Sequence, residues 1–254
     1  MTRVAVLGAK GRMGSESVRA LHATDGLEVV AEIDVDDSLD LLAESGAEVA
    51  LDFTQPGVAL DNVAWCIRHG IDVVVGTSGF DETKIAEVRA LLGDEPATGV
   101  LVVPNFSIGA VLMMRFAAAA APYFESVEVI EMHHPNKVDA PSGTATRTAE
   151  MIAAARDAAG SPALPDATTT DPTGARGAKV AGIPVHAVRA RGFTASQEVL
   201  FGGAGEIFSI RHDSIDRSSF MPGVVAAVRA VTGRPGVTVG LDAILGEDSG
   251  STQS

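Results

Sequence analysis

Residues 131–145, EMHHPNKVDAPSGTA, combine groups that could hold and protonate a small polyanion. Two adjacent histidines, His133 and His134, are followed after a short interval by Lys137. A histidine titrates near neutral pH, which suits a general acid, and the lysine offers a cation. The sequence Ser142-Gly143-Thr144 then predicts the start of a helix, where backbone amides can bind a carboxylate.

Each of these residues also has a purely structural interpretation. Ser142 is a good helix N-cap, surface lysines are common, and single histidines are more often structural than catalytic. Because side chains alternate along a strand, at most one of the two histidines is expected to face a reacting atom directly. The other is expected to contact substrate or to support the first. No third or fourth ligand stands at a spacing that suits zinc, so we predict no metal site.

A second chemical motif opens the chain. The segment GAKGRMG at 8–14 follows an apolar strand and begins a helix. Glycines permit a tight turn and bring the backbone close to a pyrophosphate at the helix N-terminus. Asp34 ends the next predicted strand, where a carboxylate can accept the hydroxyls of an adenosine ribose. An ordinary glycine turn is the alternative, but strand, helix and acid together favour a dinucleotide site.

Two further loops end predicted parallel strands, GTSG at 76–79 and VPNF at 103–106. Ligands of open α/β sheets bind along this edge, so the loops can offer backbone groups to a nicotinamide and its ribose. Simple turns use the same residue types, which is the structural alternative.

The surrounding elements predict two kinds of fold. Apolar strands alternate with helices in the first part of the chain, which indicates a doubly wound parallel sheet of the Rossmann type. The strands are 3–7, 27–33, 48–53, 71–76 and 99–104, and the helices are 12–23, 57–69 and 81–92.

The pattern changes after residue 106 and predicts an α+β domain. It holds helices at 107–121 and 143–158, a strand at 126–134, and a long loop at 160–182. Strands at 184–191, 196–202 and 206–213 follow one another directly, so we expect antiparallel pairing. A helix around Pro222 and a strand at 236–241 should return to the first domain. The predicted division is 1–105 plus 214–245 for dinucleotide binding, 106–213 for substrate binding and tetramerisation, and 246–254 as a flexible tail.

Composition limits the classes of function. The 254 residues carry a formal net charge of −14 without an evident basic face, which argues against nucleic-acid binding. The single cysteine excludes an internal disulfide. Apolar runs are too short to cross a bilayer, and the first residues lack a signal-peptide pattern, so we expect a cytoplasmic protein without a membrane partner.

Taken together, these motifs resemble the dihydrodipicolinate reductase family, the 4-hydroxy-tetrahydrodipicolinate reductases. The resemblance extends from residue 3 to about 245. It is carried by VLGAKGRMG (6–14), DFTQP (52–56), GTSGF (76–80), PNFSIG (104–109), EMHHPNKVDAPSGTA (131–145) and RHDSIDRSSFMPGV (211–224).

The resemblance implies that NADH or NADPH reduces a dicarboxylate cyclic imine to tetrahydrodipicolinate, in lysine and diaminopimelate biosynthesis. It implies a homotetramer built through the C-terminal sheets, and domain closure about hinges near 105 and 214. His133 would be the proton donor and Lys137 a second donor or a carboxylate-binding cation, while His134, Gly143 and Thr144 would hold substrate. The cofactor would contact Gly8, Ala9, Lys10, Gly11, Arg12, Met13, Asp34, Gly76, Thr77, Ser78, Val103, Pro104, Asn105 and Phe106. Some members have glutamate where this chain has Asp34, so the preference between NADH and NADPH stays open.

Two other functions agree with part of this pattern. A different two-domain Rossmann dehydrogenase would act on a semialdehyde-like or sugar substrate, but the HHxxK and SGT segments suit a dicarboxylate better. A non-catalytic NAD-binding regulator would keep the fold, yet it leaves the intact His133 and Lys137 pair unexplained.

Overall fold

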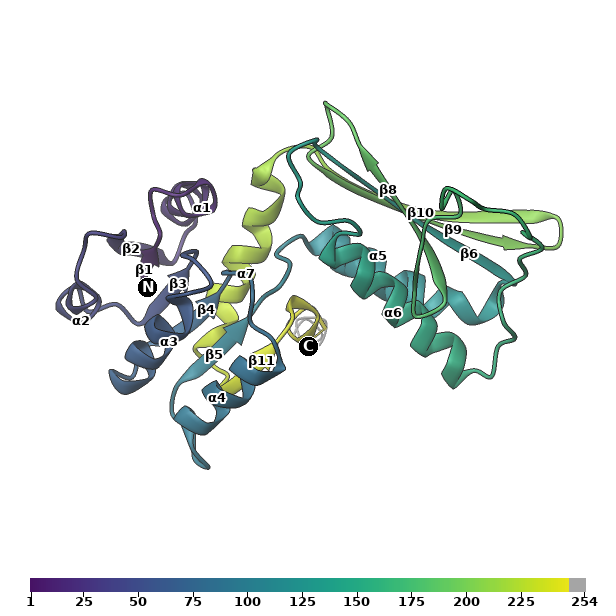
Figure 1. Ribbon diagram of the computed structural model, residues 1–254. Helices are drawn as coiled ribbons and strands as arrows, with labels where there is room; N and C mark the ends of the chain where they lie inside the picture. Colours follow the sequence, from purple (N-terminus) through teal and green to yellow (C-terminus); the bar gives the residue numbers. More distant parts are fainter. Residues whose placement is uncertain (247–254) are drawn as a thin grey trace, which may run out of the picture. The chain divides into compact units, whose positions relative to one another are not determined.

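The computed structural model describes residues 1–246, which form two compact units (Figure 1). Unit 1 comprises Met1–Ile108 and the chain from Arg217 onward, and unit 2 comprises Gly109–Asp216. Beyond residue 246, the tail predicted at 246–254 lies outside the described residues. Within the described part of the chain, no helix has the length and apolar character needed to cross a membrane.

Unit 1 contains a six-stranded parallel sheet, which confirms the predicted Rossmann-type fold. The strand order is β11-β5-β4-β3-β1-β2. Every residue of β3 and β5 is buried, as expected for parallel strands covered on both faces. The strands are β1 (Thr2–Leu7), β2 (Leu27–Ile33), β3 (Val49–Asp52), β4 (Asp72–Val75), β5 (Gly99–Val102) and β11 (Gly236–Val239).

Helices cover both faces of this sheet (Figure 1). On one face α1 (Arg12–His22) contacts α7 (Met221–Val231), and on the other α3 (Ala59–Arg68) contacts α4 (Glu82–Leu92). Pro222 lies in the first turn of α7, where its missing amide costs no intrahelical hydrogen bond. The structure adds a short helix that was not predicted, α2 (Asp40–Glu44), and single 3₁₀ turns at Arg217–Phe220 and Leu241–Ala243.

Unit 2 contains a mixed five-stranded sheet in the order β10-β9-β6-β8-β7. The hairpin of β9 and β10 is antiparallel, as predicted, but the expectation for β8 is wrong. That strand pairs in parallel with β6, which lies between β8 and β9. The unpredicted strand β7 lies in the long loop. The strands are β6 (Ser126–His133), β7 (Ala178–Val180), β8 (Ile183–Arg189), β9 (Ala195–Gly203) and β10 (Glu206–Ser214).

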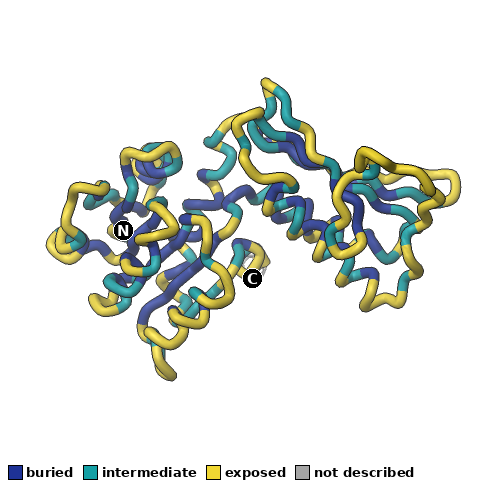
Figure 2. The backbone as a smooth tube through the Cα atoms, viewed as in Figure 1, coloured by how far each residue is buried: buried dark blue, intermediate teal, exposed yellow. Residues whose placement is uncertain are grey.

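The position of β6 between β8 and β9 explains why the order of strands along the chain predicted the wrong pairing for β8. Its alternating apolar residues face a core covered by α6 (Gly143–Ala158), and pairing on both sides satisfies its backbone. The core joins Val127 and Val129 to Ala145, Ala149 and Ile152 of the helix. Figure 2 shows that each unit contains buried stretches of backbone. Helix α5 (Ile108–Ala120) and a 3₁₀ turn at Ala121–Tyr123 add Ala117 and Ala121.

Candidate active site

The glycine loop of unit 1 has a backbone that side chains would obstruct. Gly8 has a φ of 75°, and a Cβ there would lie 2.5 Å from the carbonyl oxygen of Phe53. A Cβ on Gly14 would collide with the carbonyl group of Gly8. Gly11 is the N-cap of α1 and has no side chain to accept its first amides. The loop therefore presents a helix N-terminus that an anion can approach closely.

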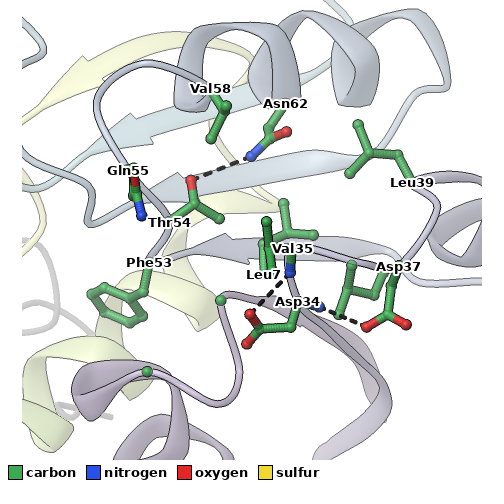
Figure 3. A pocket seen from close by; sticks show the side chains of 13 residues that line it. Leu7, Asp34, Val35, Asp37, Leu39, Phe53, Thr54, Gln55, Val58 and Asn62 are labelled. Carbon is green, nitrogen blue, oxygen red and sulfur yellow. Dashed lines mark hydrogen bonds between the residues drawn. The ribbon is translucent and has the colours of Figure 1, made fainter.

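A cavity of about 480 Å³ opens beside this loop (Figure 3). Its volume falls within the range of about 300–1,000 Å³ that is usual for small-molecule sites. Among the predicted cofactor residues, Gly8, Gly11 and Asp34 line it. The remaining lining residues come from β1 and β2, from the segments after β2 and β3, and from α3. They are Leu7, Ile33, Val35, Asp37, Leu39, Phe53, Thr54, Gln55, Val58 and Asn62, and our sequence analysis did not assign any of them to the cofactor.

Asp34, which lines the cavity, is held by backbone amides. Its Oδ2 accepts a hydrogen bond from the Lys10 amide at 2.8 Å, and its Oδ1 accepts one from the Val35 amide at 2.9 Å. These bonds, that of Val35 foremost, lower the pKa of Asp34. Its own amide donates to the carboxylate of Asp37 at 2.9 Å (Figure 3). The ionised carboxylate keeps lone pairs for further donors, such as ribose hydroxyls.

Asp52, which bonds two of the lining residues, is a fully buried carboxylate with four donors. Its Oδ1 accepts from the amide of Thr54 at 3.0 Å, from the Thr54 hydroxyl at 2.7 Å and from the Thr77 hydroxyl at 2.5 Å. Its Oδ2 accepts from the side-chain amide of Asn62 at 2.8 Å. Asp52 thus ties two residues of the cavity wall to the loop after β4. The Thr77 hydroxyl is buried in this network, whereas the neighbouring side chain of Ser78 is exposed.

Phe53 connects the three predicted cofactor loops of unit 1. Its carbonyl lies against Gly8, its ring lies 5.4 Å from the ring of Phe106, and a Cβ on Gly76 would collide with it. The loops 8–13, 76–78 and 103–106 therefore meet around one residue, the first at its backbone and the other two at its ring.

The other predicted cofactor residues divide by exposure. Ala9 and Val103 are buried, Met13 and Asn105 are partly buried, and Lys10, Arg12 and Pro104 are exposed.

The predicted proton donor lies in unit 2, at the end of β6. The Nδ1 atom of His133 lies 2.6 Å from Oε2 of Glu131, which is fully buried. Arg189 donates to both oxygens of the same carboxylate, at 2.7 and 2.8 Å. The amide of Ser142, at the N-cap of α6, donates to Oε1 at 3.1 Å. Glu131 and Arg189 were not among the site residues predicted from the sequence.

Burial and the surrounding charges together set the pKa of this histidine. Burial is the largest influence on His133 and lowers its pKa, and the positive charges of Lys137 and Arg189 act in the same direction. The hydrogen bond and charge of Glu131 oppose them, and the resulting pKa lies below the ordinary value. Burial raises the pKa of Glu131, but hydrogen bonds from Arg189 and His133 outweigh it, so this pKa is lowered.

The remaining predicted substrate residues surround the same end of β6. Lys137 forms an ion pair with Asp139 at 2.7 Å, and this contact lowers the pKa of Asp139. The Nδ1 atom of His134 is buried, and within residues 1–246 it has no hydrogen-bond partner.

The predicted N-cap of α6 is confirmed, because the Ser142 hydroxyl accepts the amide of Ala145 at 3.2 Å. A Cβ on Gly143 would meet no atom within 4 Å. Open space therefore lies beside the first turn of α6, where Gly143 and Thr144 begin the helix. Across residues 1–246, no group of three His, Cys, Asp or Glu residues is placed to hold a metal ion.

Comparisons with known proteins identify close relatives over almost the whole chain. The 4-hydroxy-tetrahydrodipicolinate reductase of Streptomyces coelicolor is 60% identical over 243 residues, covering 96% of this chain and 97% of its own. That of Cutibacterium acnes is 55% identical over 246 residues, covering 97% and 99%. The solved structure of a dipicolinate-bound dihydrodipicolinate reductase from Paenisporosarcina sp. TG-14 is 38% identical. It has a TM-score of 0.84 and covers 96% of this chain and all of its own.

A myo-inositol 2-dehydrogenase from Lactobacillus plantarum shares the fold alone, with a TM-score of 0.59 at 12% identity, covering 95% of this chain and 92% of its own. Family models match both parts of the sequence. The N-terminal model of dihydrodipicolinate reductase matches residues 2–106, and the C-terminal model matches residues 109–245. The chain therefore belongs to the dihydrodipicolinate reductase family.

Proposed function

We propose that this chain reduces the cyclic imine formed from 4-hydroxy-tetrahydrodipicolinate to tetrahydrodipicolinate, using NADH or NADPH, in lysine and diaminopimelate biosynthesis. The observation that carries this proposal is the cluster at the end of β6. There, a histidine held by a buried carboxylate lies beside a lysine and the N-terminus of α6. A proton donor, a cation and helix amides together suit a dicarboxylate that must be protonated. The dipicolinate-bound relative supports this assignment, because dipicolinate is also a ring dicarboxylate.

The glycine loop fits a nicotinamide dinucleotide. Gly8 and Gly14 leave the backbone open to a pyrophosphate, and Asp34 offers a carboxylate to the adenosine ribose. The bound cofactor would supply the hydride. Asp34 and Asp37 disfavour a 2′-phosphate, whereas the exposed Lys10 and Arg12 favour it. We therefore expect both cofactors to be used, with a mild preference for NADH.

The substrate carboxylates have two candidate partners in unit 2. One is the first turn of α6 at Gly143 and Thr144, where the helix dipole favours an anion. The other is Lys137, whose ammonium group now pairs with Asp139 and would exchange this carboxylate for one of the substrate. His134, with its unpartnered Nδ1 among residues 1–246, would donate to or accept from the same ligand.

The protein's own residues supply the proton of the reaction. After hydride addition to the ring carbon conjugated with the imine, electron density moves onto the ring nitrogen and leaves an enamine. Protonation of the neighbouring carbon by His133 restores the imine, and Lys137 stabilises the negative charge that develops.

We also propose that unit 2 forms a homotetramer through its sheet. Strand β10 lies at the edge of the sheet, and its residues Ile207 and Phe208 are 81% and 41% exposed. An exposed edge strand with large apolar side chains favours association. Light scattering after size exclusion should give a mass of about four chains of 26.0 kDa.

The test of the reaction is an assay of purified protein with enzymatically generated substrate, in which NADH and NADPH oxidation are followed separately by absorbance. We expect turnover with both cofactors, and a loss of about 10²- to 10⁴-fold in His133→Gln, the usual contribution of a general acid. Nucleotide binding without turnover would instead indicate a regulator. Turnover of semialdehydes in preference to the cyclic imine would indicate another dehydrogenase.

A further inference from the structure

Glu131 is a charged residue on the core face of a strand. The alternation of β6 places it on the same face as Val127 and Val129, which contact α6 in the core. Its exposure is 0%. A buried carboxylate is costly unless its charge is paired and its lone pairs accept hydrogen bonds, so its contacts show why it is tolerated.

Both oxygens of Glu131 accept two hydrogen bonds each. Oε1 accepts from the Ser142 amide and from one nitrogen of Arg189. Oε2 accepts from the other nitrogen of Arg189 and from Nδ1 of His133. The register places Arg189 directly opposite His133 on the neighbouring strand β8. Arg189 therefore holds the carboxylate in one plane, and the N-cap of α6 fixes its far oxygen.

We propose that Glu131 is the positioning residue for His133, because it holds the ring through the Nδ1 hydrogen and so makes Nε2 the nitrogen that delivers the proton. This inference rests on the proposed function, in which His133 protonates the reduced ring. An ionised carboxylate only accepts hydrogen bonds, so the nitrogen that faces it must carry a hydrogen. Orientation of a catalytic imidazole by a buried carboxylate is a general device of proton-transfer sites.

The proton balance is simple. The doubly protonated ring gives up the hydrogen on Nε2, whose bond breaks as a carbon–hydrogen bond forms on the substrate. The ring is left neutral, with its remaining hydrogen on Nδ1 and still bonded to Glu131. A proton from solvent then restores Nε2 before the next turnover.

The two partners of the Glu131–Arg189 pair should move the titration of His133 in opposite directions. His133 faces Glu131 on its own strand, Arg189 on β8, and Lys137 and Asp139 in the following loop. In Glu131→Gln the ring loses the negative charge that supports its protonation, so its pKa falls further. In Arg189→Gln it loses a positive charge that opposes protonation, so its pKa rises. A purely structural defect has no reason to give opposite signs.

The chain offers a matched control on the other face of the same strand. Glu128 accepts from Nε2 of His186 and from Arg176, both at 2.6 Å, and so repeats the carboxylate–histidine–arginine arrangement away from His133. We expect Glu128→Gln to leave both the His133 titration and turnover unchanged.

The experiment is an NMR titration of the full-length enzyme with ¹⁵N- and ¹³C-labelled histidine in a deuterated background. The chain has six histidines, and His133→Gln assigns the signal of interest. We expect the neutral wild-type ring to carry its hydrogen on Nδ1. The titration should move to lower pH in Glu131→Gln and to higher pH in Arg189→Gln. Turnover of Glu131→Gln should fall about 10- to 1,000-fold, by no more than in His133→Gln, with a smaller change in KM.

A neutral wild-type ring that carries its hydrogen on Nε2 would overturn the proposal. So would a shift of the same sign in both variants, or an unchanged titration in Glu131→Gln. If Glu131→Gln does not fold, the wild-type tautomer and the Arg189→Gln shift decide alone. The NMR measurement needs no substrate, so it is independent of the proposed reaction. If His133→Gln instead keeps turnover within threefold of wild type, the assignment of His133 as the acid fails, whatever the titration shows.

Discussion

Replacing Asp52 by alanine should destabilise unit 1 and weaken cofactor binding together. The substitution removes the acceptor of four hydrogen bonds from a site with no exposure. The hydroxyls of Thr54 and Thr77 can rotate toward other acceptors, and that of Thr77 already lies 3.3 Å from the Asp52 carbonyl oxygen. The amide of Thr54 and the side-chain amide of Asn62 have less freedom and would be left without this acceptor.

The magnitude follows from these two donors. An unsatisfied buried donor costs about 1–3 kcal/mol, so the buried amide of Asn62 and the partly buried amide of Thr54 together cost at most about 2–6 kcal/mol. Water that enters the vacated space meets part of this cost, so we expect a loss of about 2–4 kcal/mol in the free energy of unfolding. Because Thr54 and Asn62 line the cavity, we also expect NADH to bind about tenfold more weakly.

Two measurements separate stability from binding. The only tryptophan, Trp65, lies in α3, so its fluorescence during urea unfolding reports on unit 1. Calorimetric titration gives the Kd for NADH. The matched control is Asp72→Ala at the amino end of the neighbouring strand β4, where Asp72 accepts the Gly99 amide at 2.7 Å. This variant should destabilise unit 1 without weakening the binding of NADH. A loss below about 1 kcal/mol in Asp52→Ala would refute the buried-donor argument, and equal weakening of NADH in both variants would refute the link to the cavity.

Further predictions concern charge. Lys137→Ala should raise KM and lower turnover, and Lys137→Arg should not restore wild-type kinetics, because a planar guanidinium does not replace a compact ammonium; full activity of the arginine variant would show that charge alone suffices. Asp34→Ala should weaken NADH more than NADPH in binding titrations, because only NADH presents both ribose hydroxyls to the carboxylate. Lys10→Ala combined with Arg12→Ala should weaken NADPH binding more than NADH binding. The loss of NADPH affinity should be smaller at high salt, where a phosphate contact is screened. Equal loss of both cofactors in Asp34→Ala would make that acid structural.

The sequence predicts local structure well where periodicity and end signals agree. Strand β2 and helix α6 begin and end where predicted, and Ser142 caps α6. Pairing between distant strands was less predictable. The placement of β8 depends on which edge of β6 is available, and direct succession does not reveal this.

Glu131 and Arg189 escaped prediction for the same reason. Arg189 meets Glu131 across 58 positions of the chain, so no local spacing connects them. One signal was nevertheless present. Glu131 continues the core-facing alternation of Val127 and Val129, and a charged residue at such a position requires a partner. Asp52 offers a similar signal, since it ends a strand whose other residues are all apolar and buried.

The discontinuity of unit 1 affects the order in which the chain can fold during synthesis. All residues of unit 2 have been made when Asp216 is added, but unit 1 still lacks α7 and β11. Until β11 arrives, β5 is an open edge of the parallel sheet. Ribosomes add about 5–20 residues per second, so this edge stays unpaired for roughly 1–5 s after unit 2 is complete. A nascent chain of this protein therefore exposes a fully apolar strand edge for seconds, the interval in which a chaperone would protect it from aggregation.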